Sequence, residues 1–432
     1  MSVLSAPGAA PAPSRVRWAI LAILLGISVV TYIDRVNISV AARQMMPALG
    51  LTDVQMGYVF SSFVIGYALF QVPGGWLGDR WGARLVLSLA VVWWSFFTAL
   101  TAVAATLPTA LLLGIIGSLM LVRFLMGAGE AAALPNFNRA VANWMAPGER
   151  GLAMGVAIGG IGVGSALTPP LTAWIMVNFG WQTAFYAAGL LGLGVALVWY
   201  GYATDRPADH PSVNRAELDV IESGNEPAGA IPPVPWRSFA RTPTVWWLVL
   251  SYTCLGYVAY VYLSWFYLYL VNVRGFGELR GALFASGPFL AMALFCPLGG
   301  WATDRLTKAS GANRGRRVIG CIGMVLAALC ILLGDMIDQP YVAIACLSLG
   351  AGWLYFTVGA FWASTVDLSK SHAGTLSGLM NTGANIGGTL SPTLTPWLAD
   401  HLGWPVALGA AALAAVTGGI LWLGVRPGDG LR

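Results

Sequence analysis

Apolar runs of 18 or more residues recur along the whole chain, and each is long enough to cross a hydrocarbon layer of about 30 Å. The composition agrees, because 57% of the 432 residues are hydrophobic and only 9% are charged, whereas a soluble domain carries roughly 25% charged residues. Lipid offers no hydrogen-bond partner to the backbone, so long apolar runs of this kind must be helical. The sequence therefore predicts an all-α polytopic membrane protein embedded in a lipid bilayer.

Twelve membrane-spanning helices are expected. Their approximate residue ranges are 17–42, 54–77, 84–106, 110–136, 152–177, 183–203, 244–271, 281–302, 317–336, 341–366, 373–398 and 405–425. One long polar stretch, 204–243, divides them six and six and is read as a cytoplasmic central loop. This predicts six-helix bundles at 17–203 and 244–425, with a disordered cytoplasmic tail at 1–16 and a second cytoplasmic tail at 426–432.

The basic residues orient these spans. If the amino terminus is cytoplasmic, the outer loops hold only Arg43, Arg274 and Arg280. The inner loops and tails then hold Arg15, Arg17, Arg80, Arg84, Arg150, Arg206, Arg215, Arg237, Arg241, Arg305, Lys308, Arg314, Arg316, Arg317, Lys370, Arg426 and Arg432. Because Lys and Arg gather on the cytoplasmic side, we expect a multi-pass protein of the cell (inner) membrane with both termini in the cytoplasm. The net charge of +5 follows from this topology and does not indicate nucleic-acid binding.

The two halves of the chain are parallel repeats. Gly151, Gly155, Gly160, Gly164, Leu167, Pro169, Leu171, Thr172, Trp174, Gly180 and Trp181 recur 223 residues later as Gly374, Gly378, Gly383, Gly387, Leu390, Pro392, Leu394, Thr395, Trp397, Gly403 and Trp404. The segment 75–80 recurs as 300–305 in the same way. Two repeated bundles with a site between them are typical of transporters that work by alternating access.

Four charged residues lie deep inside predicted spans. Asp34 and Arg35 belong to the first span, and Arg123 and Glu130 to the fourth. A charge at the middle of a bilayer costs about 2.5–3.5 kcal/mol on insertion scales, so these groups must face one another or a wet cavity. Arg123 and Glu130 are seven residues apart and share one helix face. We interpret the four as a site that handles protons and an anion. A buried structural ion-pair network is the alternative.

The segment 75–84 reads Gly-Trp-Leu-Gly-Asp-Arg-Trp-Gly-Ala-Arg. Its pattern and its place between the second and third spans resemble the signature loop of the major facilitator superfamily. The resemblance implies a conformational latch at the cytoplasmic face, with counterparts in the second half; a basic turn that only sets topology is the alternative. We call the following residues the cytoplasmic latch: Asp79, Arg80, Arg84, Asp304 and Arg305.

Within that superfamily, the chain resembles the anion:cation symporter family of galactonate, glucarate, hexuronate and other organic-anion transporters. The resemblance covers essentially the whole chain. It rests on Tyr32 to Asn37, Gly57 to Ser61, Gln71 to Trp76, Arg123, Gly129 to Ala131, Leu134-Pro135, Asn138-Arg139, Glu149-Arg150, Arg215 to Asp219, Asn381, Asn385, Gly387-Gly388 and Ser391-Pro392. Two stretches depart from the pattern of many relatives, Ser264 to Tyr267 and Gly159 to Gly162, and both make the pocket less sugar-like.

This resemblance implies proton-driven uptake (symport) of a small organic anion such as a sugar acid or another carboxylate. By matching position, Asp34 and Glu130 look like the proton-carrying acids, and Arg35 resembles the arginine that meets the substrate carboxylate. Arg123 looks like the partner of the acids and is counted with the substrate-binding residues. The other substrate-binding residues implied are Tyr32, Tyr67, Asn381 and Asn385. For the two asparagines, which lie one turn apart, hydrogen bonding between helices is the alternative role.

Other classes of protein are less well supported. The five cysteines show no metal or disulfide spacing, and no G-x-x-x-x-G-K-[ST] nucleotide loop occurs. No nucleophile–base pair or metal cluster lies in the spans, so we expect neither an enzyme nor a cofactor. The partners expected are a carboxylate substrate and protons, and the expected state is a monomer. An organic-anion exporter or antiporter on the same fold remains an alternative, and a transporter-like membrane sensor a weaker one.

Overall fold

The structure, a computed structural model, describes residues 12–146, 149–223, 236–369 and 373–429. These residues form helices, and no strand occurs among them. Eleven helical segments within the described residues are long and apolar enough to cross a membrane. The prediction of an all-α membrane fold is therefore confirmed.

The remaining predicted span, 373–398, corresponds to the helix α17 (Ala373–Leu402). At 30 residues it is as long as its neighbours. It does not count among the eleven because Asn381, Asn385 and many Gly and Thr residues reduce its hydropathy. A span that packs between other helices can carry such residues, since little of it has to face lipid.

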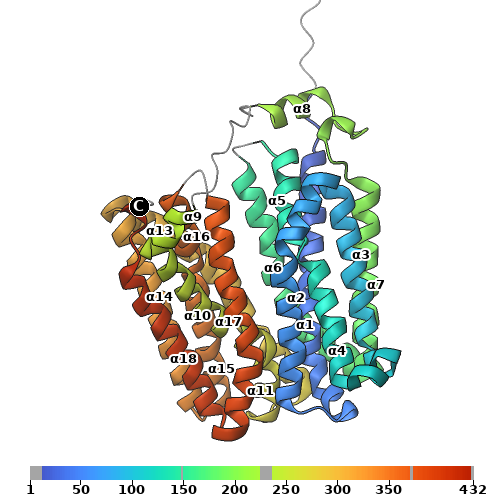
Figure 1. Ribbon diagram of the computed structural model, residues 1–432, viewed down its shortest axis with the longest axis vertical. Helices are drawn as coiled ribbons and strands as arrows, with labels where there is room; N and C mark the ends of the chain where they lie inside the picture. Colours follow the sequence, from blue (N-terminus) through green and yellow to red (C-terminus); the bar gives the residue numbers. More distant parts are fainter. Residues whose placement is uncertain (1–11, 147–148, 224–235, 370–372, 430–432) are drawn as a thin grey trace, which may run out of the picture.

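The first half of the chain forms one group of helices (Figure 1). Its members are α1 (Val16–Leu49), α2 (Asp53–Trp81), α3 (Ala83–Thr101), α4 (Pro108–Glu130), α5 (Ala133–Trp144), α6 (Arg150–Phe179) and α7 (Trp181–Tyr202). Within this group α1 packs against α6, α2 against α4, and α3 against α7.

The second half forms the other group. Besides α17 it contains α10 (Pro243–Ser264), α11 (Phe266–Asn272), α12 (Glu278–Ala285), α13 (Gly287–Ser310), α14 (Ala312–Met336), α15 (Pro340–Phe356), α16 (Val358–Leu368) and α18 (Trp404–Leu421). Here α10 packs against α17, α13 against α15, and α14 against α18. These pairings repeat those of the first half, helix for helix.

The repeat extends to the helix ends. Shifted by 223 residues, the bounds of α6 fall on the bounds of α17, and the first residue of α7, Trp181, falls on the first residue of α18, Trp404. The predicted duplication of two parallel repeats is confirmed. It explains why a site between the halves is lined by helices that are related in pairs.

Several predicted spans are broken rather than continuous. The fourth ends as α4 at Glu130 and resumes as α5 at Ala133, and the tenth is interrupted at Thr357 between α15 and α16. The seventh and eighth also divide, into α10 and α11 and into α12 and α13. The break at the end of α4 has a direct consequence, because it places Glu130 in the last turn of a helix inside the first half.

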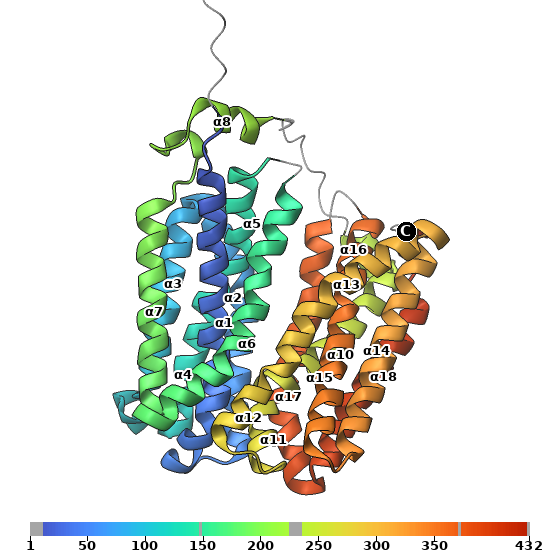
Figure 2. The ribbon, with the colours of Figure 1, turned by 180° about the vertical axis from the view of Figure 1, so that it is seen from behind.

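The two halves touch each other at the end of the molecule remote from the chain termini. There the Ser61 hydroxyl on α2 donates to the Thr389 carbonyl oxygen on α17 at 2.7 Å, and the Ser286 hydroxyl donates to the Ala166 carbonyl oxygen at 2.5 Å. Arg43 donates to the Asn272 side chain at 2.9 Å. Figure 2 shows the halves converging at this end, near α11 and α12, and diverging towards the end that carries α5, α8 and α16.

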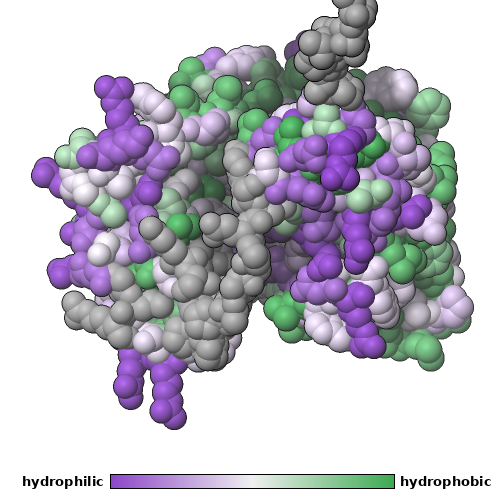
Figure 3. Space-filling model, turned by 90° about the horizontal axis from the view of Figure 1, so that it is seen from above, coloured by the Kyte–Doolittle hydropathy of each residue, from purple (hydrophilic) through white to green (hydrophobic). Residues whose placement is uncertain are grey.

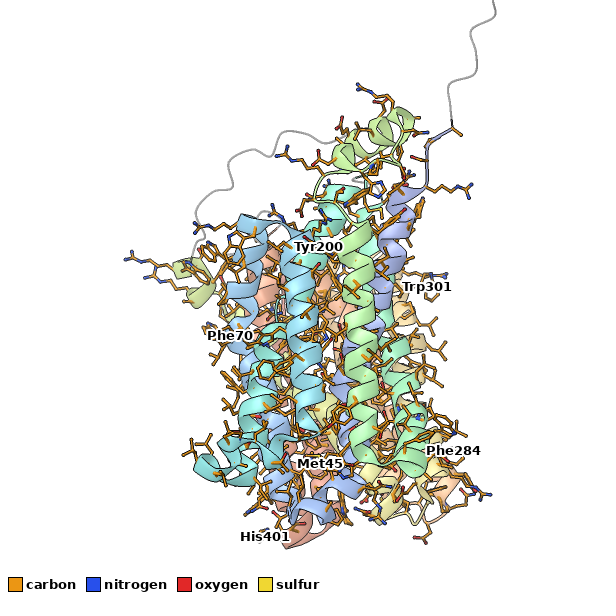
Figure 4. All side chains as sticks on the ribbon, turned by 90° about the vertical axis from the view of Figure 1, so that its right-hand side faces the viewer. Met45, Phe70, Tyr200, Phe284, Trp301 and His401 are labelled. Atoms are coloured by element: carbon orange, nitrogen blue, oxygen red, sulfur yellow. The ribbon has the colours of Figure 1, made fainter. Side chains whose placement is uncertain are left out.

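Seen from above, the opposite end is rich in hydrophilic side chains on both halves, with a hollow between them (Figure 3). Figure 4 gives the depth of individual residues: Tyr200 lies near this end, while Met45 and His401 lie near the converging end. The structure is therefore closed at one end and parted at the end that carries the termini.

Part of the predicted central loop folds onto the first half. The short helix α8 (Arg215–Glu222) places the buried Glu217 beneath the start of α1. The Glu217 carboxylate accepts hydrogen bonds from the backbone N–H groups of Val16 and Arg17, both at 3.1 Å, and from the Ser14 hydroxyl at 2.5 Å. A second short helix, α9 (Trp236–Arg241), precedes α10. Residues 1–11 of the predicted tail and 224–235 of the loop lie outside the described residues.

Candidate functional site

Arg35, in the middle of α1, is the centre of the site. Its guanidinium forms an ion pair with the Glu130 carboxylate and donates a hydrogen bond to the Tyr32 hydroxyl at 3.2 Å. The guanidinium carbon also lies 4.8, 4.9 and 4.7 Å from the ring centroids of Tyr32, Phe63 and Tyr67. Arginine stacks well on aromatic faces, so this arrangement fixes the guanidinium in place.

Helix geometry assembles these residues. Tyr32 precedes Arg35 by three positions, and Phe63 precedes Tyr67 by four, so each pair shares one helix face. The face of α2 that carries Phe63 and Tyr67 is brought near α4 by glycines. A Cβ on Gly66 would lie only 2.2 Å from the Phe124 carbonyl oxygen, and one on Gly127 only 2.1 Å from the Phe63 carbonyl oxygen. The close approach of α2 and α4 lets aromatic and charged groups meet around Arg35.

Arg35 lies between two cavities. One has about 340 Å³ of empty space and is lined by Arg35, Val36, Ile38, Ser39, Phe60, Phe63, Val64, Arg123, Tyr260, Leu263 and Ser264. The other has about 270 Å³ and is lined by Ser28, Thr31, Tyr32, Arg35, Tyr67, Glu130, Ala133, Leu134, Phe137 and Ile161. We call them the outer and the inner cavity, because the first lies further along α1 from the chain terminus. Arg35 lines both, and its partner Glu130 lines the inner one.

Asp34 points elsewhere. Adjacent helical residues diverge by about 100°, and Asp34 lines neither cavity although Arg35 lines both. It is fully buried, and one carboxylate oxygen accepts a hydrogen bond from the Trp94 indole N–H at 3.1 Å. The other carboxylate oxygen has no hydrogen-bond partner among the described residues. The fields of Glu130 and Arg123 both reach Asp34, so the two predicted acids are electrostatically linked without touching.

Arg123 is also buried, but it forms no ion pair among the described residues. Its guanidinium donates to the Met126 sulfur at 2.9 Å and lies over the Phe63 ring, 5.1 Å from the centroid. The sequence-based view of Arg123 as the partner of the acids thus holds only through the electrostatic fields of Asp34 and Glu130. Arg123 does line the outer cavity, as a substrate-binding residue should.

The second half reaches the site through α10 rather than α17. Tyr260, Leu263 and Ser264 line the outer cavity, whereas Asn381 and Asn385 line neither cavity. A Cβ on Gly388 would lie 2.5 Å from the Tyr260 ring, so the tyrosine is packed against α17. The structure therefore does not bring the two predicted asparagines to Arg35.

Sequence reasoning missed the aromatic residue that both arginines contact. Phe63 carries no polar group and lies in an apolar run, so nothing in the composition marks it out. The spacing of four residues to Tyr67 was the available signal. Trp94 was missed for the same reason, because its indole N–H identifies it only once Asp34 is seen beside it.

The cytoplasmic latch residues all bind within their own half. The Asp79 carboxylate pairs with Arg139 on α5 at 2.5 Å, and Asp304 pairs with Arg316 on α14 at 2.9 Å. Arg84 donates to the Tyr200 carbonyl oxygen at 2.8 and 3.0 Å. The guanidinium groups of the other two members stack on tryptophans of their own helices: Arg80 on Trp76 and Arg305 on Trp301. The two halves thus carry equivalent, separate networks at this end.

No group of three or more His, Cys, Asp or Glu residues that could hold a metal ion occurs within the described ranges. What the site offers instead is a buried arginine held by an acid between two cavities, inside a membrane-spanning bundle of two repeats. This combination defines a membrane transport protein and not an enzyme.

Comparison with known proteins agrees. The family model described as Major Facilitator Superfamily matches residues 24–392. A probable sulfoacetate transporter of Cupriavidus necator is 34% identical over 392 residues, covering 90% of this chain and 89% of its own. A probable galactarate/D-glucarate transporter of Bacillus subtilis is 32% identical over 433 residues, covering 95% and 92%. The chain belongs to the major facilitator superfamily.

The fold is also shared with solved transporter structures. A bacterial homolog to the human lysosomal transporter Spinster superposes with a TM-score of 0.78, covering 96% of this chain and 98% of that one at 21% identity. The resemblance to anion:cation symporters that the sequence suggested is confirmed by the relatives named above.

Proposed function

We propose that this protein takes up a small organic anion together with protons, by alternating access. The observation that carries the proposal is the Arg35–Glu130 ion pair, which lies between the two cavities. An arginine suits recognition of a carboxylate or a related anion, since its planar fork can donate two parallel hydrogen bonds. Relatives named for sulfoacetate and for galactarate and D-glucarate support an organic anion as the substrate.

Proton coupling follows from competition for one guanidinium. A substrate anion that binds Arg35 displaces the Glu130 carboxylate, which then remains buried without its cation. Arginine does not release its proton in proteins, so the neutralising proton must reside on the acid. Binding of the anion and binding of the proton then favour each other, and this coupling is reciprocal. Asp34, linked to Glu130 through its field, is the second proton-carrying acid in this proposal.

Movement of the two halves supplies the access. We propose that residues 17–203 and 244–425 rock against each other, with both termini in the cytoplasm and the protein in the cell (inner) membrane. The parted end that carries the termini is then the cytoplasmic end, and the contacts at Ser61 and Ser286 close the external end. Both halves line the outer cavity, so one chain holds a complete site and acts as a monomer.

The test uses purified protein in lipid vesicles and the variant Glu130→Gln, which keeps the shape of the side chain but cannot release a proton. Downhill exchange of a bound carboxylate should survive at least in part, because it needs no net proton movement. Accumulation driven by an imposed inward proton gradient should fail. Accumulation by the variant would refute Glu130 as the coupling acid, and accumulation by the wild type only under an outward gradient would identify an exporter or antiporter instead.

A further inference from the structure

Arg123 is a buried cation without an anionic partner. Its side chain is 1% exposed, and none of the ion pairs among the described residues includes it. Its hydrogen bond goes to the Met126 sulfur, a weak acceptor, and its Nε atom has no partner. A guanidinium removed from water in this way is costly unless an anion approaches it. Arg35, in contrast, already has Glu130.

Both arginines face the outer cavity. The two guanidinium carbons lie 4.9 and 5.1 Å from the centroid of the same Phe63 ring, and both side chains line this cavity. The other lining residues are uncharged: Val36, Ile38, Ser39, Phe60, Phe63, Val64, Tyr260, Leu263 and Ser264. Within its lining, the outer cavity therefore carries two positive charges and no negative charge.

The nearby acids do not balance this charge inside the cavity. Glu130 lines the inner cavity, and Asp34 lines neither and is held by Trp94. A substrate with one acidic group can satisfy Arg35 when Glu130 is displaced. It leaves Arg123 as it was, buried and unpaired.

We propose that the substrate is a small divalent anion, with one acidic group bound by Arg35 and the second by Arg123 across the face of Phe63. This rests on the proposed transport of organic anions and narrows its substrate class. The two guanidinium groups flank one ring, so a backbone of only a few carbons can join the two acidic groups. Two acids, Asp34 and Glu130, are present to take up protons when such an anion neutralises both arginines.

Matched pairs of probes test the proposal: malonate against propionate, succinate against butyrate, and glutarate against pentanoate, at neutral pH. Each pair has the same number of carbons and differs by one acidic group. Affinities are measured by calorimetry on the purified full-length protein in detergent. The best diacid should bind at least about tenfold more tightly than its monoacid, which is the value of one charge-assisted contact.

Two variants locate the effect. Arg123→Gln should abolish the margin between diacid and monoacid while leaving monoacid binding through Arg35, and retained monoacid binding also shows that the variant is folded. Arg123→Lys keeps a charge at the site and should retain part of the margin. Equal binding of both members of every pair by the wild type, or an unchanged margin in Arg123→Gln, would overturn the divalent-anion proposal and leave organic-anion transport standing. If no carboxylate binds at all, the proposed function itself fails.

Discussion

Four side chains surround Arg35 in one buried space: an acid, two tyrosines and a phenylalanine. A desolvated cation–π contact is worth about 2 kcal/mol, and several act on this one guanidinium together. The ring contacts remain when Glu130 is displaced, so the guanidinium keeps its orientation at the moment when the ion pair opens. The substrate then meets a binding group that is already in position, which lowers the entropy cost of binding.

This predicts the effect of Arg35→Lys. Lysine keeps the positive charge but loses the planar fork and most of the stacking on Tyr32, Phe63 and Tyr67. Carboxylate affinity should fall by at least about tenfold, while the protein still inserts and folds. Calorimetry and thermal unfolding of the purified variant measure both properties. Arg43→Lys, at a half-exposed arginine near the far end of α1, is the matched control and should bind as the wild type does.

The residues of the site were predictable to the extent that lipid penalises charge. Asp34, Arg35, Arg123 and Glu130 stand out because an apolar run cannot carry them without a reason. Asn381 and Asn385 were misjudged because the face that α17 presents to the cavities depends on packing. Backbone atoms of α10 lie 2.5 and 2.1 Å from where a Cβ would stand on Gly383 and Gly387. The spacing of residues along one helix does not contain that information.

Among the elements, the contact between α2 and α17 holds the halves together at the external end. A Cβ on Gly57 would lie 2.3 Å from the Pro392 carbonyl oxygen, and the Ser61 hydroxyl also contacts the Thr393 hydroxyl at 3.0 Å. The two helices touch backbone to backbone here. Small residues at such contacts are what allow membrane helices to approach closely.

Gly57→Ala should therefore push the halves apart at this end and favour the state that is open to the outside. Spin labels or fluorophores on the external ends of α2 and α17 should report a longer mean distance than in the wild type. Gly155→Ala, in α6, is the control, since a Cβ there meets nothing within 4 Å. Identical distance distributions in wild type and Gly57→Ala would show that the contact does not limit opening.

The cytoplasmic latch gives a prediction at the opposite end. Asp79 is exposed and pairs with Arg139, so Asp79→Asn should change the free energy of unfolding by less than about 1 kcal/mol. Its effect should appear in the balance between inward-open and outward-open states, because the loop loses its hold on α5. Distances across this face measure the change, and Asp219→Asn, in the exposed pair with Arg215, is the control. An unaltered balance would reduce the loop to a topology signal.

Helices were easier to predict than their interruptions. The number of spans and the shift of 223 residues follow from hydropathy and repeated glycines. The breaks after Glu130 and at Thr357 do not, because neither place has a proline or glycine that would mark it. Packing of the two repeats decides these breaks, and the break after Glu130 helps to place the coupling acid.

For the whole molecule, the segment between the halves is fastened to only one of them. Glu217 binds the first backbone N–H groups of α1 and also the Arg17 side chain, at 3.2 Å, which in turn reaches Glu149 at 3.1 Å. The start of α1, the start of α6 and α8 are thereby joined. A carboxylate at a helix N-terminus is well placed, because the unpaired N–H groups there carry partial positive charge.

Glu217→Ala should therefore destabilise the first half by roughly 1–3 kcal/mol, the usual cost of leaving buried donors without a partner. Thermal unfolding of the purified protein measures this, and Glu222→Ala, at an exposed position of α8, should have little effect. Substrate affinity should be unchanged in both variants, since neither residue lines a cavity. Equal melting temperatures for Glu217→Ala and wild type would mean that the join bears no load.

The position of Arg35 between two cavities also has an electrical consequence. A cavity that opens to a solution takes on the voltage of that solution, so the membrane voltage falls mainly across the barrier that remains. In this protein that barrier includes the Arg35–Glu130 pair. Moving one elementary charge across the full voltage is worth about 2.3 kcal/mol per 100 mV, and here the field that supplies it is concentrated over the width of a few side chains. Protons arriving at Glu130 would thus gain most of the electrical energy of the membrane within a single short step.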